Sequence, residues 1–235
     1  MAIIEPFALA IGFLLSYIYD FEVSYGVSIV ILTIIINIII FPLTLRQTRS
    51  TKRMQDAQPE LKRIQKQYKD NKEEMNKKVA EYYKENGINP LGCIVPLLVQ
   101  MPVWFALFRV LREPLLFIPK EATLYSALGD PLSVLFFNMD LQVPASAINA
   151  WVDRLPYIVL ILFVVGTALI QQNQLTKKQG TTNNPQQQQM QMIGKVMPIF
   201  FGFISWTLPS GLVVYFLTGN IFRIGQQALI VRLEE

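Results

Sequence analysis

The apolar run TIIINIIIF at 33–41 places one side-chain amide, that of Asn37, among isoleucines. An amide in hydrocarbon costs free energy unless another group hydrogen-bonds to it. Thr33 lies one helical turn before Asn37 on the same face, and further polar side chains stand in the other apolar runs: Gln100, Gln171, Gln172, Tyr215 and Asn220. These groups donate and accept hydrogen bonds, so the chemistry they offer is recognition of polar groups at membrane depth.

Residues for other kinds of chemistry are scarce. The chain has no histidine and one cysteine, Cys93, which excludes an internal disulfide framework. The sequence contains no zinc motif, nucleotide-binding loop or Ser–His–Asp arrangement. We therefore expect no enzymatic activity, no metal site and no cofactor.

Two interpretations of the polar side chains are open. Each can form an interhelical hydrogen bond worth about 0.6 to 2 kcal/mol, or together they can line a polar cavity that water enters from the cytoplasm. Their spread over at least three helices favours the cavity, because a bundle that needed only packing would use small residues. The cavity would also suit a transport pathway, although the apolar runs contain no carboxylate or histidine for proton coupling and no matched pair of broken helices.

The elements that must position these residues are membrane-spanning helices. Hydrophobic residues make up 52% of the 235 residues and charged residues 16%, against about 25% charged in a typical soluble domain. Charge-free runs at 23–45, 86–108, 155–176 and 196–222 are long enough to span the hydrocarbon core, and TLPSG at 207–211 divides the last run into two helices. The sequence predicts an all-α integral membrane protein with five transmembrane helices, at 23–45, 87–112, 155–173, 192–207 and 211–229, around a hydrophilic groove.

A basic segment at 46–86 follows the first predicted span. Residues 46–85 contain 12 of the 21 lysines and arginines against 7 acidic residues. The positive-inside rule therefore places this segment and the tail at 230–235 in the cytoplasm, with the N-terminus outside. Apolar residues at spacings of three and four predict two amphipathic helices that form a hairpin. The basic side chains expected to contact cytoplasmic partners or anionic lipids are Arg46, Arg49, Lys52, Arg53, Lys62 and Arg63.

Three segments lie outside the predicted spans and hairpin. At 1–22, the apolar stretch Pro6–Tyr19 is too short to span and lacks the basic flank of a signal peptide, so we expect an interfacial helix outside the cell. Residues 113–154 should form an extracytoplasmic loop with short helices. Residues 174–191 are rich in amides and should form a flexible cytoplasmic loop.

Three stretches carry a family resemblance: SYGVSIVILTIIINIIIFPLTLRQTRSTKRMQDAQPELKRIQKQYKDN, ENGINPLGCIVPLLVQMPVWFALFRVLRE and MPIFFGFISWTLPSGLVVYFLTGNIFRIGQQ. In this order they resemble the first core helix with its basic hairpin, the second helix, and the last two helices of the YidC/Oxa/Alb membrane protein insertases. The resemblance covers most of the chain from about residue 24. The absence of a large N-terminal domain resembles the short Gram-positive type.

The resemblance implies a protein of the bacterial cell membrane that inserts and folds other membrane proteins, alone or beside the Sec translocon. Its groove would open to the cytoplasm and to lipid and would be closed on the outside. The implied partners are nascent membrane proteins, the ribosome, the Sec translocon and anionic lipids, without sequence-specific binding of nucleic acid. Thr33 and Tyr215 match substrate-contacting positions of the family, Gln100 its QMP glutamine, and Gln171 or Gln172 a groove position in the third helix.

The sequence departs from the family pattern at Asn37, where the family usually carries a groove arginine or lysine. Three interpretations follow. The groove works by hydration alone, which we favour; a basic residue elsewhere substitutes, with Arg46 about 13 Å further along the helix as the candidate; or the chain is a variant that uses acidic substrates poorly.

Two other functions compete with insertion. A channel for small solutes or ions would use the same polar cavity but would need an opening on the outer side. A passive assembly subunit would use the basic hairpin to dock another complex.

Overall fold

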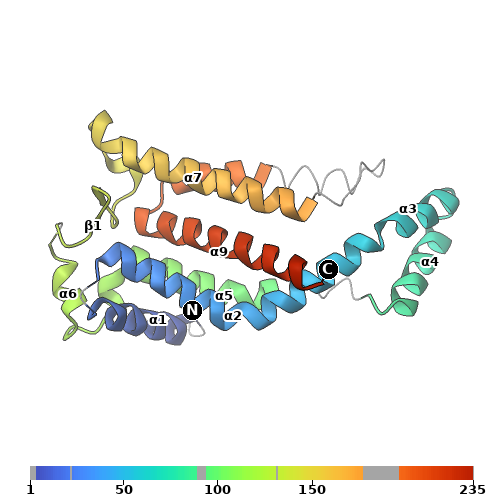
Figure 1. Ribbon diagram of the computed structural model, residues 1–235, viewed down its shortest axis with the longest axis horizontal. Coiled ribbons are helices and arrows are strands. Elements are labelled where there is room, and N and C mark those ends of the chain that lie inside the picture. Colours follow the sequence, from blue (N-terminus) through green and yellow to red (C-terminus); the bar gives the residue numbers. More distant parts are fainter. Residues whose placement is uncertain (1–3, 22, 89–93, 131, 177–195, 235) are drawn as a thin grey trace.

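The computed structural model describes residues 4–21, 23–88, 94–130, 132–176 and 196–234. They form an elongated bundle of helices (Figure 1). At one end of the bundle a pair of helices projects from it, and we call this the hairpin end. At the other end lie the short elements of residues 113–150, and we call this the loop end.

Helices lie at all five stretches predicted to span. They are α2 (Tyr25–Asp56), α5 (Ile94–Arg112), α7 (Trp151–Thr176), an unlabelled helix at Val196–Ser205, and α9 (Ser210–Glu234). The mostly helical fold is thus confirmed. Among the described helices, two are long and apolar enough to cross a membrane, namely Tyr25–Met54 and Trp151–Gln174. The count of five spans stays a prediction.

The helix α2 runs past its predicted boundary at residue 45 and ends at Asp56. The change from apolar to basic residues after Leu45 marks a change of surroundings, and nothing in 46–56 breaks a helix because this stretch has neither glycine nor proline. Pro42 lies inside the helix and donates no backbone hydrogen bond, and the hydroxyls of Thr44 and Thr48 donate to the backbone carbonyls of Phe41 and Thr44. Four of the predicted basic contacts, Arg46 to Arg53, therefore extend the first helix rather than forming a separate element.

The hairpin itself consists of α3 (Gln58–Gln67) and α4 (Lys72–Glu85). Asn71 caps α4, since its side-chain oxygen accepts a hydrogen bond from the Glu74 amide at 3.2 Å. Leu61 is the one buried side chain of α3, and α4 has none. The hairpin projects away from the bundle beyond the end of α2 (Figure 1).

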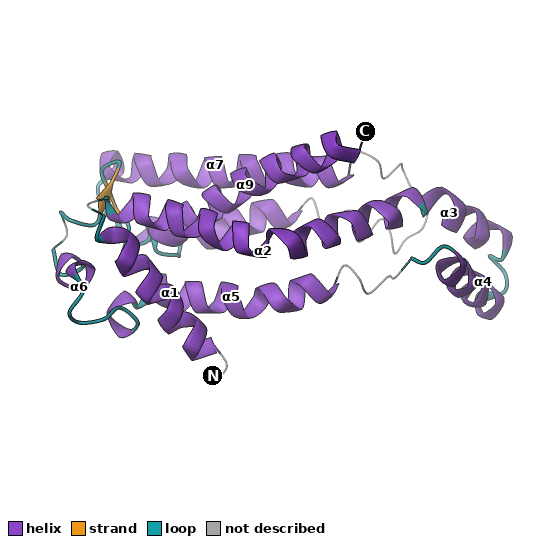
Figure 2. Ribbon diagram, turned by 60° about the horizontal axis from the view of Figure 1, so that its bottom comes forward, coloured by secondary structure: helices purple, strands orange, loops and turns teal. Residues whose placement is uncertain are grey.

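In the bundle, α9 packs against both α2 and α7, and α1 (Ile4–Tyr19) packs against α5 and α2 (Figure 2). The approach of α1 depends on Gly12, because a Cβ at this position would collide with the backbone carbonyl of Phe117. The apolar core joins the buried faces of α1, α2, α5, α7 and α9 with residues of the loop end. The predicted interfacial position of 1–22 stays a prediction.

The loop end contains three short helices and a small two-stranded sheet, and the sheet is the part that the sequence pattern did not reveal. They are η2 (Pro114–Leu116), α6 (Thr123–Ala127), the antiparallel strands β1 (Leu135–Phe136) and β2 (Met139–Asp140), and η3 (Ala145–Ala147). The strand pair packs on the start of α2, where a Cβ at Gly26 would collide with the Phe136 ring. Most of the predicted flexible loop at 174–191 lies outside the described residues.

Candidate functional site

The helices α2 and α9 run side by side in a constant register. A Cβ built on Gly211 would lie 3.1 Å from Cδ1 of Ile29, and Nε2 of Gln226 donates to Oγ1 of Thr44 at 2.5 Å. Each contact joins residue n of α2 to residue n + 182 of α9. Because the two helices start at the same end, this register places Thr33 level with Tyr215 and Asn37 level with Gly219.

Thr33 and Tyr215 belong to the packed core. Their exposed fractions are 0% and 2%. The Thr33 hydroxyl donates to the Ile29 carbonyl of its own helix at 2.6 Å, and the Tyr215 ring packs against Phe216 with 5.6 Å between centroids. The two predicted site residues therefore sit together inside the seam between α2 and α9.

Asn37 is half-buried, and its Nδ2 donates to the Thr33 carbonyl at 2.7 Å. The strongly exposed isoleucines of this stretch are Ile34, Ile38 and Ile39, at 37%, 56% and 68%. They mark the outward face of α2, and Asn37 lies off that face. Its amide group thus finds one partner within the helix and stands beside the α9 seam.

Packing changes along the bundle at the level of Asn37. In α2, side chains are buried up to Ile36, and among the described residues of 37–56 none is. Among the α7 side chains that the structure describes, Val164 is the last buried one, and in α9 six consecutive residues, Ser210–Tyr215, are buried before burial becomes sporadic. The core therefore occupies the loop-end half of these three helices, and the described residues of their other halves bury few side chains.

The other predicted groove residues lie elsewhere. Asn220 turns toward α7, where its Nδ2 lies 3.4 Å from the Val164 carbonyl and 3.3 Å from the Thr167 hydroxyl. This is an interhelical link of the kind that the packing interpretation describes. Gln171 and Gln172 lie half-buried on α7, one turn further toward the hairpin end. Gln100 lies on α5, and its side chain is outside the described part of the chain.

Gln226 is a polar residue of this seam that the predicted site lacks. Its side chain is 9% exposed and joins α9 to α2 through Thr44. The helical spacing in the sequence could have identified Gln226, because it follows Tyr215 by 11 residues, which is about three helical turns. Both side chains therefore face α2.

The loop end is closed by hydrogen bonds between the segment 141–146 and the turn before α9. The Ser210 amide and hydroxyl both donate to the Val143 carbonyl, at 3.1 and 2.9 Å, and the Gly211 amide donates to the Leu141 carbonyl at 2.9 Å. The Ser146 amide donates to the Trp206 carbonyl at 3.1 Å. These bonds cover the start of α9, where Leu212 has no exposed surface.

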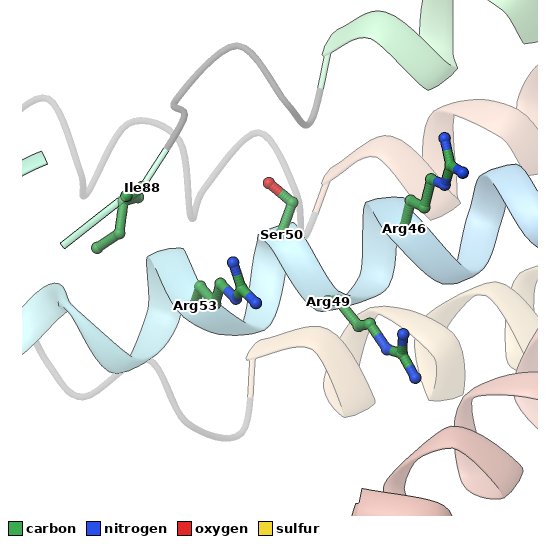
Figure 3. A pocket seen from close by; sticks show the side chains of 6 residues that line it. Arg46, Arg49, Ser50, Arg53 and Ile88 are labelled. Atoms are coloured by element: carbon green, nitrogen blue, oxygen red, sulfur yellow. The ribbon is translucent and has the colours of Figure 1, made fainter. Parts of the chain in front are cut away.

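Basic side chains gather at the other end. Arg46, Ser50 and Arg53 lie along one side of α2. With Arg49, Gly87 and Ile88 they line an open pocket of about 260 Å³ (Figure 3). A second cavity of about 340 Å³ adjoins it between Arg49, Lys52, Arg53 and Asp56. Guanidinium groups in such a cluster suit phosphate or carboxylate oxygens.

The two basic residues predicted on the hairpin lie apart from these cavities, on α3. Arg63 is exposed and lies 3.7 Å from the Glu60 carboxylate. Lys62 is on the same helix. Among the described residues, no group of three or more histidine, cysteine or acidic side chains could hold a metal ion.

Comparisons with known proteins agree with these features. The sequence profile of the 60Kd inner membrane protein family matches residues 17–235. A protein of Fusobacterium nucleatum named membrane protein insertase YidC is 36% identical over 223 residues, which cover 94% of this chain and 93% of that protein. One of the same name from Pelobacter propionicus is 37% identical over 221 residues, covering 93% of this chain but 37% of the relative.

A solved structure has a similar fold. It is described as an active YidC insertase with the first transmembrane domain resolved, and it matches with a TM-score of 0.57 and 24% identity over 89% of this chain and 42% of its own. Together with the family profile and the two relatives, this likeness identifies the protein's family: the chain belongs to the 60Kd inner membrane protein family, whose members include these YidC insertases.

Proposed function

We propose that this protein inserts and folds other membrane proteins, alone or with the Sec translocon. The observation that carries the proposal is the uneven core, which is tightly packed from the loop end to the level of Ile36 and Tyr215 and loose beyond it. Relatives of nearly the same length and of greater length bear the name membrane protein insertase. The loose half supplies the space in which a polar substrate segment is held.

In this proposal the hairpin end faces the cytoplasm. The excess of lysine and arginine in 46–85 supports the orientation. The five helices at 25–56, 94–112, 151–176, 196–205 and 210–234 then surround a hydrophilic groove that opens to the cytoplasm. Thr33, Asn37, Gln100, Gln171, Gln172, Tyr215 and Asn220 are the proposed groove residues.

The physical gain of such a groove is a shorter path through hydrocarbon. Each unpaired polar group of a translocating segment costs several kcal/mol in lipid, and a wet groove that ends near the middle of the membrane removes half of that path. Burial of the substrate's apolar helix and the membrane potential, worth about 2.3 kcal/mol per charge at 100 mV, drive the remaining step. No covalent chemistry is needed.

The arginine cavities at the hairpin end suit the partners of this activity. Arg46, Arg49 and Arg53 stand where α2 leaves the predicted span, so lipid phosphates and acidic surfaces of a ribosome or of the Sec translocon are the anions that they meet. A channel would need an opening at the loop end, and the hydrogen bonds of Ser210 and Gly211 close that end.

Site-specific photocrosslinking tests the proposal. A photoreactive residue at Asn37, Thr33, Gln100 or Tyr215 should capture a ribosome-bound single-span protein stalled during insertion, and one at the outward-facing Ile39 should capture it much less. Purified protein in liposomes should also insert the same substrate without other proteins. Crosslinks that are equal at all positions, together with no insertion above protein-free liposomes, would contradict the proposed function.

A further inference from the structure

Arg223 is the one charged residue of α9 before its last turn. It lies in a helix that packs against α2, α5 and α7, and its side chain is half-buried. A charged residue at such a position is costly unless it serves a function or has a partner. Its surroundings therefore decide what it does.

The direction of Arg223 follows from its neighbours on α9. The Phe216 ring lies 6.4 Å from Trp104 of α5 and 6.0 Å from Phe201 of the helix Val196–Ser205, so this face of α9 looks into the bundle. Arg223 follows Phe216 by seven residues, or about two turns, and shares that face. It also lies between Asn220, which turns to α7, and Gln226, which turns to α2.

The depth of the guanidinium group follows from Gly219. A Cβ built on Gly219 would lie 3.6 Å from Nη2 of Arg223, so the side chain bends back by one turn toward the loop end. In the register of α2 and α9, Gly219 is level with Asn37. The guanidinium group thus reaches the level of Asn37, where the packed core ends, and the glycine leaves room for it.

Arg223 has no counter-ion in the part of the chain that the structure describes. Within the described part of the chain, no carboxylate lies within ion-pair distance of Arg223, and the runs 23–45, 155–176 and 196–222 contain no acidic residue. An arginine in this position needs water or an incoming anion, because a desolvated and unpaired charge is strongly unfavourable.

We propose that Arg223 binds carboxylates of the polar segment that a substrate threads into the bundle. This inference rests on the proposed insertion function and names its ligand class. A planar guanidinium group pairs with a carboxylate through two parallel hydrogen bonds. The level of Asn37 is about 18 Å from the start of α2, near the middle of a hydrocarbon core of about 30 Å, so a polypeptide reaches it and a lipid phosphate does not.

The test compares two single-span substrates that differ only in their translocated tails, one with four aspartates and one with four asparagines. Insertion is measured in liposomes of fixed lipid composition for the unmodified protein, Arg223→Gln, Arg223→Lys and Arg232→Gln. Arg223→Gln should reduce insertion of the aspartate tail about tenfold, which corresponds to about 1.4 kcal/mol, and should leave the asparagine tail unchanged. Arg223→Lys should restore part of the loss, and Arg232→Gln, on the exposed end of α9, should have no effect.

A second variant keeps the test independent of folding. Asn37→Arg places a guanidinium group at the same level from α2, so the double variant Asn37→Arg/Arg223→Gln should recover insertion of the aspartate tail. Equal losses for both tails, or no recovery in the double variant, would overturn the role of Arg223. A photoreactive residue at Asn37 that labels lipid instead of the aspartate tail would overturn it too. If the unmodified protein inserts neither substrate, the proposed function itself fails.

Discussion

At the scale of single residues, Asn37 reduces the cost of its amide by two means. Its Nδ2 donates to the Thr33 carbonyl at 2.7 Å, which satisfies one donor within the helix. It lies beside the α9 seam, off the face of Ile38 and Ile39, where water in the proposed groove would satisfy the remaining donor and the oxygen. The amide therefore fits the edge of the packed core, where the proposed groove would begin.

Cysteine labelling tests this hydration. In a chain with Cys93→Ser, Asn37→Cys should react with a charged thiol reagent added from the hairpin side, because water makes the thiolate accessible. Ile38→Cys is the matched control, since Ile38 is 56% exposed on the outward face and a membrane would cover it. Modification of residue 38 and not of residue 37 would show that the amide lies in a dry seam.

A second prediction concerns Glu81 of the hairpin, whose side chain is 42% exposed. A hydrogen bond of 2.8 Å from Nζ of Lys78 lowers the pKa of its carboxyl, and nearby Lys77 adds a weaker charge effect. Because the pKa is lowered, the pair is present at neutral pH and is lost as the pH falls through the lowered value. Lys78→Met should raise the Glu81 pKa, and Lys77→Met should raise it less, as measured by carboxyl NMR titration. An unchanged pKa in Lys78→Met would show that the pair does not persist in solution.

At the scale of elements, close approach at glycines sets how the loop end packs on the helices. Gly26 lies against the Phe136 ring of β1, and a Cβ there would collide with it. Gly166 of α7 has no atom within 4 Å of the corresponding position. The two glycines occur in similar apolar helices and differ in what surrounds them.

The pair therefore supplies a matched stability test. Gly26→Ala should lower the free energy of unfolding by about 1–3 kcal/mol, the usual cost of overpacking. Gly166→Ala should leave it unchanged or raise it, because alanine favours a helix more than glycine does. Thermal unfolding in detergent measures both, and equal midpoints for the two variants would contradict the packing at β1.

The sequence could predict the positions of the helices but not all of their ends or the contacts between them. Apolar runs predicted helices at the right places, because membrane length and charge limits leave few alternatives. The sequence predicts that the first span ends at residue 45, because the charged residues that follow mark a change of surroundings. The helix α2 nevertheless continues to Asp56, because a helical backbone does not need to be surrounded by hydrocarbon. The direction of the Asn220 side chain toward α7 could not be predicted in this way. The period of 3.6 residues tells which residues share a face of one helix, and packing between helices decides which neighbour that face meets.

Arg223 shows the same limit at a functional position. Its sequence position indicates only a basic residue near the hairpin-side end of the last predicted span, and the candidate substitute for a cation at position 37 is Arg46. The structure bends the Arg223 side chain back over Gly219 by one turn. The level that the Arg223 guanidinium group reaches along the bundle follows from the register of α2 and α9. Two tertiary contacts establish this register, and no local sequence pattern encodes it.

At the scale of the whole molecule, the two ends of the bundle differ in packing. The loop end joins the start of α9 to residues 141–146 by hydrogen bonds and buries Leu212 completely, while the far halves of α2, α7 and α9 bury few side chains. A groove that is closed at one end holds polar segments without letting ions through. A channel has both ends open.

This difference predicts no ion conduction by the resting protein. Liposomes that contain it and an ion-sensitive dye should leak no faster than protein-free liposomes, because the core at the loop end blocks the path. Leu212→Ala should raise the leak, since it leaves a cavity in that core, whereas Leu229→Ala should not, since Leu229 is 50% exposed. Rapid flux through the unmodified protein would instead support the channel, because no packed loop end could then separate the polar space from the other side of the membrane.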